Sequence, residues 1–414
     1  MTASAFPHRP EFAPEPARRF DLDWLRIIAF GLLIFYHIGM YFVTWPWHVK
    51  SVHAGPAIQP LMLLTSPWRL ALLFLIAGVA TRYMAGKFAR DGQSRGAMAR
   101  KRSARLLLPL VFGMLVVVPP QTYAEIVGKL GFDGGFAAFY AKYIGFHDGW
   151  QVDGARLIVP TWNHLWFVAY LWVYTMIVLA ALPLLHGAPA RRLGLWLQRR
   201  LAGRGLVVWP ALLLIALRLT LRPVFGQTHA LFDDWYLHAV YFSLFLFGFG
   251  IARAEAVWAA LDRLLRPALV LALAAYALIA ASMLAFPDGL PAAFRPWRDA
   301  LWAFDQWIWI LALLGLARRH LNHDGRLRRF LTGAVFPFYI LHQTAIVLLG
   351  HHLRGLGLSA GAEALILVAG TLVACLIGFE IVRRIRPLRP LFGLGPVAAA
   401  GQAAGPAAVR SAVP

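Results

Sequence analysis

Residues 23–42 read DWLRIIAFGLLIFYHIGMYF, an apolar stretch that carries an arginine, Arg26, and a histidine, His37. The stretch is long enough to cross a bilayer as one helix. Arg26 and His37 are close to three helical turns apart, so they share a helix face and are separated by about 16 Å along its axis. Ionisable groups are costly at membrane depth, and they usually face a protein interior or a watery cavity. The spacing therefore indicates a site for a long, anionic substrate.

The composition of the whole chain agrees with a membrane protein. Of its 414 residues, 60% are hydrophobic and 14% are charged, which predicts an all-α polytopic membrane protein. The net charge of +21 would suggest nucleic acid in a soluble protein, but the basic residues lie between the apolar runs, so we expect no nucleic-acid partner. The single cysteine, Cys375, excludes disulfides. We expect no metal site, no bound cofactor and no cleavable signal peptide.

The chain contains about ten apolar runs of membrane-spanning length. We predict a transmembrane helix in each of these ranges: 23–43, 61–81, 104–122, 164–185, 206–222, 236–252, 267–286, 301–317, 333–350 and 361–382.

The distribution of lysine and arginine predicts the orientation of these helices. The two tails and every second loop together hold 29 of the 40 basic residues, and the intervening loops hold 8. Cytosolic loops carry the excess of basic residues, so both termini are expected in the cytosol. We divide the chain into a cytosolic N-terminal tail (1–20), a transmembrane domain (21–388) and a disordered C-terminal tail (389–414).

His37 has two interpretations. A histidine inside a membrane helix can simply hydrogen-bond to a neighbouring helix. Its alignment with Arg26 favours catalysis instead, because an imidazole of near-neutral pKa can take the proton of a sugar hydroxyl that attacks a thioester.

Arg102 and Arg105 precede the third span in the run RKRSAR (residues 100–105). Most of this run is explained by ordinary cytosolic positive charge. Because the two arginines are three residues apart, they share a helix face and are also candidates to bind phosphates.

The fourth span opens with Asn163, His164 and Trp166, and aromatic faces beside hydrogen-bonding groups suit a carbohydrate; the alternative is an interfacial aromatic anchor. Tyr339 and His342 share a face of the ninth span, where a structural contact between helices is the alternative to a site role. Arg69, at the outer end of the second span, is expected either to reach the surface or to contact an acceptor.

These motifs, in this order, resemble the acyltransferase 3 family. The resemblance spans about residues 20 to 385. Within the family, the chain looks most like the branch that includes glucan biosynthesis protein C, which succinylates periplasmic glucans. It rests on Arg26 with His37, on Arg102-x-x-Arg105, and on three further runs: FLIAG (74–78), HLWF (164–167) and YILHQ (339–343). Relatives often have Ser-Gly where this chain has Ala77-Gly78. Any role that the serine hydroxyl has in those relatives is therefore absent here.

The resemblance implies acyl transfer from a cytosolic acyl-CoA to a carbohydrate hydroxyl on the outer side of the plasma membrane. His37 would be the essential histidine, and Arg26, Arg102 and Arg105 would hold the phosphates of the donor, which is a co-substrate and not a bound cofactor. Asn163 and His164 are candidates to orient the acceptor or to stabilise the oxyanion, and Tyr339 and His342 are candidates to support the site.

A membrane carrier for a lipid-linked sugar or an anion is the rival function. Carriers usually show inverted repeats with paired broken helices, and the sequence shows none. The acyl group, the acceptor, a transient acyl-histidine and the oligomeric state all stay open at this point.

Overall fold

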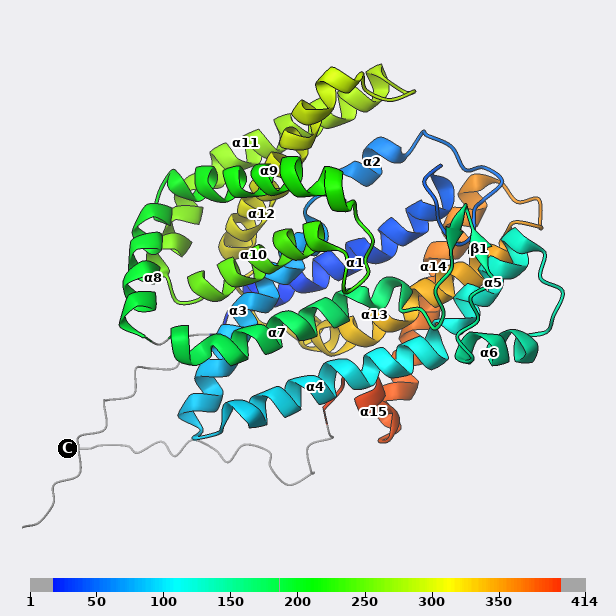
Figure 1. Ribbon diagram of the computed structural model, residues 1–414, viewed down its shortest axis with the longest axis horizontal. Coiled ribbons are helices and arrows are strands. Elements are labelled where there is room, and N and C mark those ends of the chain that lie inside the picture. Colours follow the sequence, from blue (N-terminus) through cyan, green and yellow to red (C-terminus); the bar gives the residue numbers. More distant parts are fainter. Residues whose placement is uncertain (1–17, 186, 396–414) are drawn as a thin grey trace, which may run out of the picture.

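The computed structural model describes residues 18–185 and 187–395, which fold almost entirely into α-helices (Figure 1). The predicted all-α membrane class is confirmed, because nine helices in this part of the chain are long and apolar enough to cross a membrane. Helix α10 (Trp235–Ile251) is also apolar but has only 17 residues. With α10 included, each of the ten predicted spans falls on one of these helices.

The elements follow one another along the chain without a large sheet. The other helices are α1 (Phe20–Phe42), α2 (Gln59–Leu63), α3 (Arg69–Arg90), α4 (Arg95–Phe112), α5 (Pro119–Leu130), α6 (Phe136–Ile144), α7 (Trp166–Leu185), α8 (Ala188–Leu201), α9 (Gly205–Phe225), α11 (Glu255–Ala285), α12 (Arg295–His320), α13 (Arg326–Leu353), α14 (Ala360–Arg384) and α15 (Leu388–Leu391). A π-helical turn (Gly113–Val117) joins α4 to α5, and 3-10 turns precede α7 (Asn163–Leu165) and α12 (Ala292–Phe294).

Helix α1 lies in the centre of the bundle and packs against α3, α12, α13 and α14 (Figure 1). Leu25, Ala29 and Leu33 of α1 are buried in the main hydrophobic core. These contacts bury one side of α1, while Ile28 and Phe35 are exposed on another side. Arg26 and His37 lie on this one continuous helix, as predicted.

Helix α3 begins later than the predicted second span, which was placed at residues 61–81. The short helix α2 ends at Leu63, turns follow, and α3 starts at Arg69. Pro67 lies in the break, because a proline has no N–H to continue a helical hydrogen-bond ladder through it. The guanidinium of Arg69 therefore stands at the first turn of a membrane helix.

Helices α3 and α10 touch backbone to backbone. A Cβ added at Gly78 would collide with the carbonyl oxygen of Phe245, and a Cβ added at Gly248 would collide with that of Leu75. Small residues allow such close helix approach inside a membrane. The glycine of the FLIAG run is thus explained by packing.

The long segment between α5 and α7 is ordered and forms a cap beside the bundle. It holds α6 and a two-stranded antiparallel hairpin, β1 (Gln151–Val152) and β2 (Ala155–Arg156). Phe139, Tyr143, Trp150 and Val159 of this segment form a separate hydrophobic cluster with Ile126 of α5.

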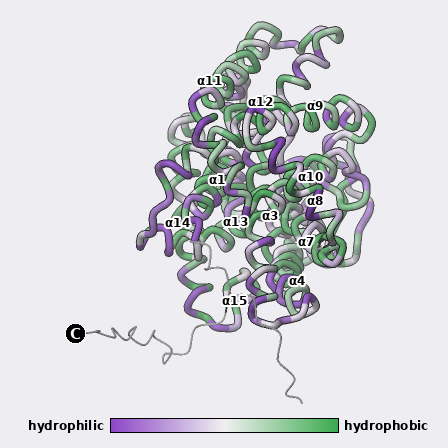
Figure 2. The backbone as a smooth tube through the Cα atoms, turned by 90° about the vertical axis from the view of Figure 1, so that its left-hand side faces the viewer, coloured by the Kyte–Doolittle hydropathy of each residue, from purple (hydrophilic) through white to green (hydrophobic). Residues whose placement is uncertain are grey.

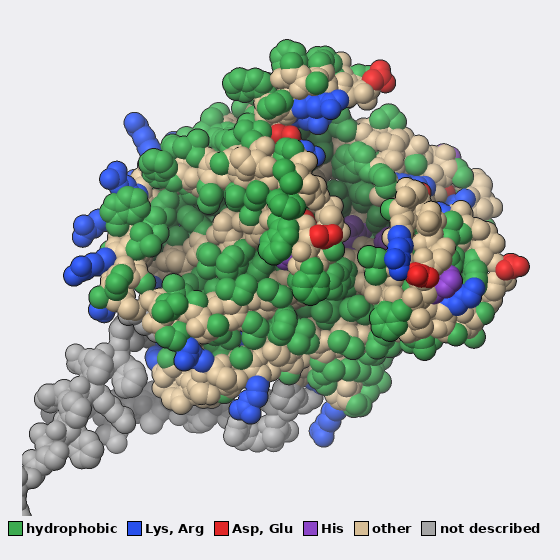
Figure 3. Space-filling view, viewed as in Figure 1, with side chains coloured by type: hydrophobic (Ala, Val, Ile, Leu, Met, Phe, Trp, Pro, Cys, Tyr) green, Lys and Arg blue, Asp and Glu red, His purple; other side chains and the backbone are tan. Residues whose placement is uncertain are grey.

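Hydrophobic residues run along most of the helices, and hydrophilic segments gather in the connections (Figure 2). Lysine and arginine side chains are frequent at the end of the molecule where α8 lies (Figures 1 and 3). Within the predicted C-terminal tail, α15 is helical and Phe392 packs on Phe112, with ring centroids 5.4 Å apart. Residues 1–17 and 396–414 lie outside the described residues.

Candidate functional site

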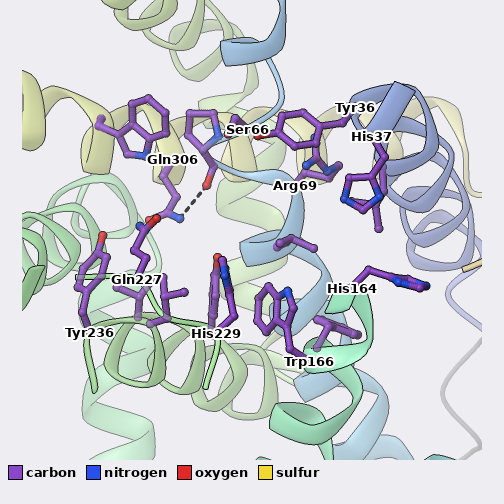
Figure 4. A pocket seen from close by; sticks show the side chains of 18 of the residues that line it. Tyr36, His37, Ser66, Arg69, His164, Trp166, Gln227, His229, Tyr236 and Gln306 are labelled. Carbon is purple, nitrogen blue, oxygen red and sulfur yellow. Dashed lines mark hydrogen bonds between the residues drawn. The ribbon is translucent and has the colours of Figure 1, made fainter. Parts of the chain in front are cut away.

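His37 lines a cavity of about 220 Å³ inside the bundle (Figure 4). Histidine side chains are visible at the bottom of a hollow on one face of the molecule (Figure 3). Helices α1, α3, α7, α9, α10, α12 and α13 all contribute to the cavity wall. Its lining residues are Leu33, Tyr36, His37, Ser66, Pro67, Arg69, Leu70, His164, Trp166, Phe167, Arg218, Gln227, His229, Tyr236, Leu237, Val240, Tyr241, Trp302, Gln306 and Tyr339.

A second histidine, His342, is hydrogen-bonded to His37. The Nδ1 atom of His37 lies 2.9 Å from the Nε2 atom of His342, and the Nδ1 atom of His342 lies 2.7 Å from the carbonyl oxygen of Tyr339. A carbonyl only accepts hydrogen bonds, so Nδ1 of His342 carries its proton and Nε2 of a neutral His342 accepts. His37 must then donate from Nδ1. In the neutral pair the Nε2 atom of His37 carries a lone pair and no proton, which is the state of a base.

The hydrogen bonds of His164 select the opposite tautomer, with the proton on Nε2. Its Nε2 atom lies 3.1 Å from the carbonyl oxygen of Ile340 and so donates to it, while its buried Nδ1 atom has no hydrogen-bond partner among the described residues. The Tyr339 hydroxyl donates to the carbonyl oxygen of His164. A neutral His164 therefore keeps a lone pair on Nδ1, and it has no second N–H for a developing oxyanion.

Arg69 brings a positive charge to the cavity beside His37 (Figure 4). Its side chain is 2% exposed, and its guanidinium lies 4.1 Å from the centroid of the Tyr36 ring. One Nη atom donates to the Thr65 hydroxyl at 2.9 Å, and Nε has no partner within the part of the chain that the structure describes. Buried charges are normally paired, so an uncompensated guanidinium is a ready site for an anion.

Trp166 and His229 form an aromatic wall between the two ends of the cavity (Figure 4). Their ring centroids are 4.5 Å apart. His229 lies in the loop between α9 and α10, where burial lowers its pKa below the ordinary value, against the opposing effect of Asp234. At neutral pH this imidazole is therefore uncharged.

Asn163 is turned away from the cavity into a separate polar network. Its side-chain amide donates to Gln121 at 3.0 Å, and Gln121 also accepts from Gln343 at 3.0 Å. Gln343 in turn lies 3.0 Å from His48, whose Nδ1 atom lies 2.5 Å from a carboxylate oxygen of Glu125. The structure thus places Asn163 beside the site but not among the residues that line it.

Arg26 lines a different cavity, of about 590 Å³, near the basic end of α1. It shares this cavity with Arg18, Arg19, Lys87 and Arg90, while its own acidic neighbour, Asp23, is 3.4 Å away and also pairs with Arg328 at 2.7 Å. The charge is therefore only partly compensated.

Arg102 and Arg105 do not line either cavity. Arg105 is nevertheless close enough to Arg26 for their charges to repel, and it has the same effect on Arg102. The structure thus gathers all three arginines at one end of the bundle, away from His37. Phe30 lies on α1 between Arg26 and His37, and its ring packs on Phe167 and Tyr339 with centroids 6.1 and 5.2 Å apart.

Residues 19–380 match the family described as an acyltransferase domain, the acyltransferase 3 family. The chain belongs to this family. No curated protein and no solved structure matches it. The protein is therefore an acyltransferase with multiple membrane-crossing helices.

Several residues that line the cavity around His37 were not predicted from the sequence. Arg218, Gln227, His229, Tyr236 and Gln306 come from α9, α10, α12 and the loop between α9 and α10. One signal was present, because Arg218 is an arginine inside an apolar run and such residues usually mark a functional or paired position. The others carry no local pattern, since only the folded bundle brings them together.

Proposed function

We propose that this acyltransferase moves an acyl group from a cytosolic acyl-CoA to a hydroxyl of a carbohydrate on the outer side of the plasma membrane. The observation that carries the proposal is the hydrogen-bonded chain from the Tyr339 carbonyl through His342 to His37, which leaves Nε2 of His37 unprotonated in a cavity. A general base needs a lone pair within reach of the proton it removes.

In the proposed reaction, Nε2 of His37 takes the proton of the acceptor hydroxyl as that oxygen attacks the thioester carbonyl carbon. The carbonyl oxygen becomes an oxyanion in the tetrahedral intermediate. Collapse of the intermediate breaks the carbon–sulfur bond, and the protonated His37 returns its proton to the departing CoA thiolate. The products are an ester and free CoA, and the scheme needs no metal. Attack by His37 itself, through an acyl-histidine, is the alternative route to the same products.

Arg69 is the group best suited to stabilise the oxyanion. It is the cation beside His37, and its Nε–H is not used by any described residue. A preorganised donor in a dry site stabilises charge that develops in the transition state without reorganisation. His164 is less suited to this task, because its protonated nitrogen already binds the carbonyl of Ile340.

The donor is proposed to bind with its phosphates at Arg26, Arg102 and Arg105 and its thioester at His37. The separation of about 16 Å along α1 suits an extended pantetheine arm. Phe30 lies on α1 between Arg26 and His37 and packs on Phe167 and Tyr339 of the cavity wall, so the arm has to pass these rings. Trp166 offers an aromatic face to the acceptor sugar.

The orientation follows from the charge of the two ends. In the proposed orientation the basic loops and Arg26 face the cytosol together with both termini, as the excess of lysine and arginine predicts. The glucan biosynthesis protein C branch then remains the proposed subfamily, with a periplasmic or surface glycan as the acceptor.

The proposal is tested with radiolabelled acyl-CoA, membranes that contain the protein, and a glycan acceptor. His37→Ala is expected to lower labelling of the glycan by about 100- to 10,000-fold, the usual contribution of a general base. His53→Ala is the matched control, because His53 is exposed and lies outside the cavity. Unchanged labelling in His37→Ala would show that His37 is not the base.

A further inference from the structure

The cavity around His37 has a second end, which the reaction does not need. In Figure 4, His37, Tyr36 and Arg69 lie at one end, and Tyr236, Gln227 and Gln306 lie at the other. Arg218 belongs to this second end, because one of its Nη atoms donates to the Tyr236 hydroxyl at 3.2 Å. We call the pair Arg218 and Tyr236, with Trp302 beside them, the distal subsite.

The distal subsite is built from buried, preorganised groups. Arg218 is 6% exposed and Tyr236 is 3% exposed. The Arg218 guanidinium lies 5.0 Å from the centroid of the Trp302 ring, and its Nε and Nη2 atoms donate to Asp299 at 3.0 and 2.9 Å. This arrangement fixes the plane of the guanidinium and leaves N–H groups of Nη1 and Nη2 for another partner.

The charge of this region is not balanced. Asp299 also accepts from Arg222 at 3.1 Å, so two guanidiniums share one carboxylate. No aspartate or glutamate is among the described residues that line the cavity, whereas Arg69 and Arg218 are. A surplus of buried positive charge is costly unless an anion compensates it.

Tyr236 adds a directed donor to this charge. An arginine cannot accept a hydrogen bond, so in its contact with Arg218 the Tyr236 oxygen is the acceptor. The hydroxyl proton of Tyr236 is therefore free to be donated to a ligand. A guanidinium and a hydroxyl that converge in this way suit the oxygens of a carboxylate or a phosphate.

We propose that the acceptor of the acyl group carries a fixed negative charge, a carboxylate or a phosphate, which Arg218 and Tyr236 bind at the distal subsite. The inference rests on the proposed function and names its substrate class. The charge is assigned to the acceptor because the subsite is formed near the end of α9 and the starts of α10 and α12, at the side opposite Arg26 and the donor phosphates.

The test compares three acceptors that share one sugar scaffold: maltose, its glucuronic acid counterpart and maltose 6′-phosphate. The full-length protein in lipid nanodiscs is given radiolabelled acetyl-CoA or succinyl-CoA, and kcat/KM is measured for each pair. We expect the charged acceptors to be preferred. Arg218→Gln is expected to lower the ratio of charged to neutral kcat/KM by about 10- to 100-fold, as for loss of a hydrogen bond to a charged group.

Two further variants make the result specific. Arg222→Gln is the matched control, because Arg222 pairs with the same Asp299 but does not line the cavity, and its ratio should stay within about twofold of wild type. Tyr236→Phe leaves every ion pair in place and should lower the ratio several-fold. It keeps the test decisive if Arg218→Gln does not fold.

The outcomes separate the inference from the proposed function. Equal kcat/KM for the three acceptors would overturn the inference and leave acyl transfer intact. A preference that follows the charge of the acyl group and not that of the acceptor would also overturn it. If wild type acylates none of the acceptors, and the glucuronic acid compound does not raise its melting temperature, both proposals fail.

Discussion

The Nδ1 atom of His37 lies 2.9 Å from the Nε2 atom of His342, and the two imidazole planes are within 3° of parallel. His342 is fully buried, and its other nitrogen donates to the backbone of its own helix. His342 therefore acts as a positioning residue that selects the tautomer of His37, since the hydrogen bond made by one ring nitrogen decides the state of the other.

Replacement of His342 tests this relationship. His342→Phe removes the acceptor for His37 Nδ1, so we expect kcat to fall by about 10- to 100-fold, the usual size of such an outer-shell effect. His342→Gln offers an amide oxygen to the same N–H and should recover part of the loss. The pH profile of kcat should shift in His342→Phe and return towards wild type in His342→Gln. Equal loss in both variants, with an unshifted profile, would mean that His342 only fills space.

Arg69→Gln tests the oxyanion role. The variant keeps a polar side chain but removes the charge, and we expect kcat to fall by about 100- to 1,000-fold, as for loss of one oxyanion donor. The KM for the acceptor should change little. Arg82→Gln is the control on the same helix, because Arg82 lies over the Phe249 ring at 5.1 Å and does not line the cavity. A higher KM with an unchanged kcat would assign Arg69 to substrate binding alone.

Much of the fold was predictable because membrane-spanning helices can be recognised in a sequence by their length and hydropathy. The continuous helix that carries Arg26 and His37 follows directly from residues 23–42. The start of α3 was predicted too early because the apolar residues of α2 lie just before it, and hydropathy alone does not show that turns separate the two helices.

The site was predictable only where its residues form local patterns. His37, His164, Trp166, Tyr339 and Arg69 were identified as candidates, and the structure brings all five to one cavity. The distal subsite was missed because its members come from three helices, α9, α10 and α12, and no local sequence pattern links them. Asn163 shows the opposite case. Its neighbours in the chain suggested a site, but a hydrogen bond to Gln121 decides its direction, and Gln121 lies on another helix.

Arg26→Gln tests the binding site of the donor. We expect KM for acyl-CoA to rise by about 10- to 100-fold through the loss of a charge-assisted contact to phosphate, with a much smaller change in kcat. Raised salt should weaken donor binding to wild type more than to the variant. Arg329→Gln is the control. Arg329 is exposed at the same end of the bundle and pairs with Asp324 at 2.9 Å. An unchanged KM for acyl-CoA in Arg26→Gln would show that Arg26 does not bind the donor.

The lowered pKa of the Lys50 amine predicts that the stability of the protein depends on pH. Its ammonium group donates to the carbonyl oxygens of Met40 and Val43 at the end of α1, and burial together with the charge of Lys129 lowers its pKa to about 8. A lysine in the unfolded chain has a pKa of about 10.4. Between these values the unfolded state binds more protons, so the contribution of Lys50 to stability should rise with pH across this window.

The measurement for Lys50 is the melting temperature of wild type and Lys50→Met from pH 7 to pH 10.5. Wild type should gain stability relative to the variant above pH 8, because methionine does not titrate. Two parallel curves over this range would show that the amine is not the titrating group.

Gly78→Ala tests the contact between α3 and α10. The added Cβ would meet the backbone of Phe245, which cannot swing aside as a flexible side chain can. We expect a loss of about 1–3 kcal/mol in the free energy of unfolding, the usual cost of overpacking, and the same for Gly248→Ala. Gly250→Ala is the matched control on α10, since among the described residues no packing atom lies within 4 Å of a Cβ placed there, and it should be neutral or slightly stabilising because alanine favours helix. Unfolding of the three variants in mixed detergent micelles measures the difference, and equal stability of Gly78→Ala and Gly250→Ala would contradict a backbone contact at this crossing.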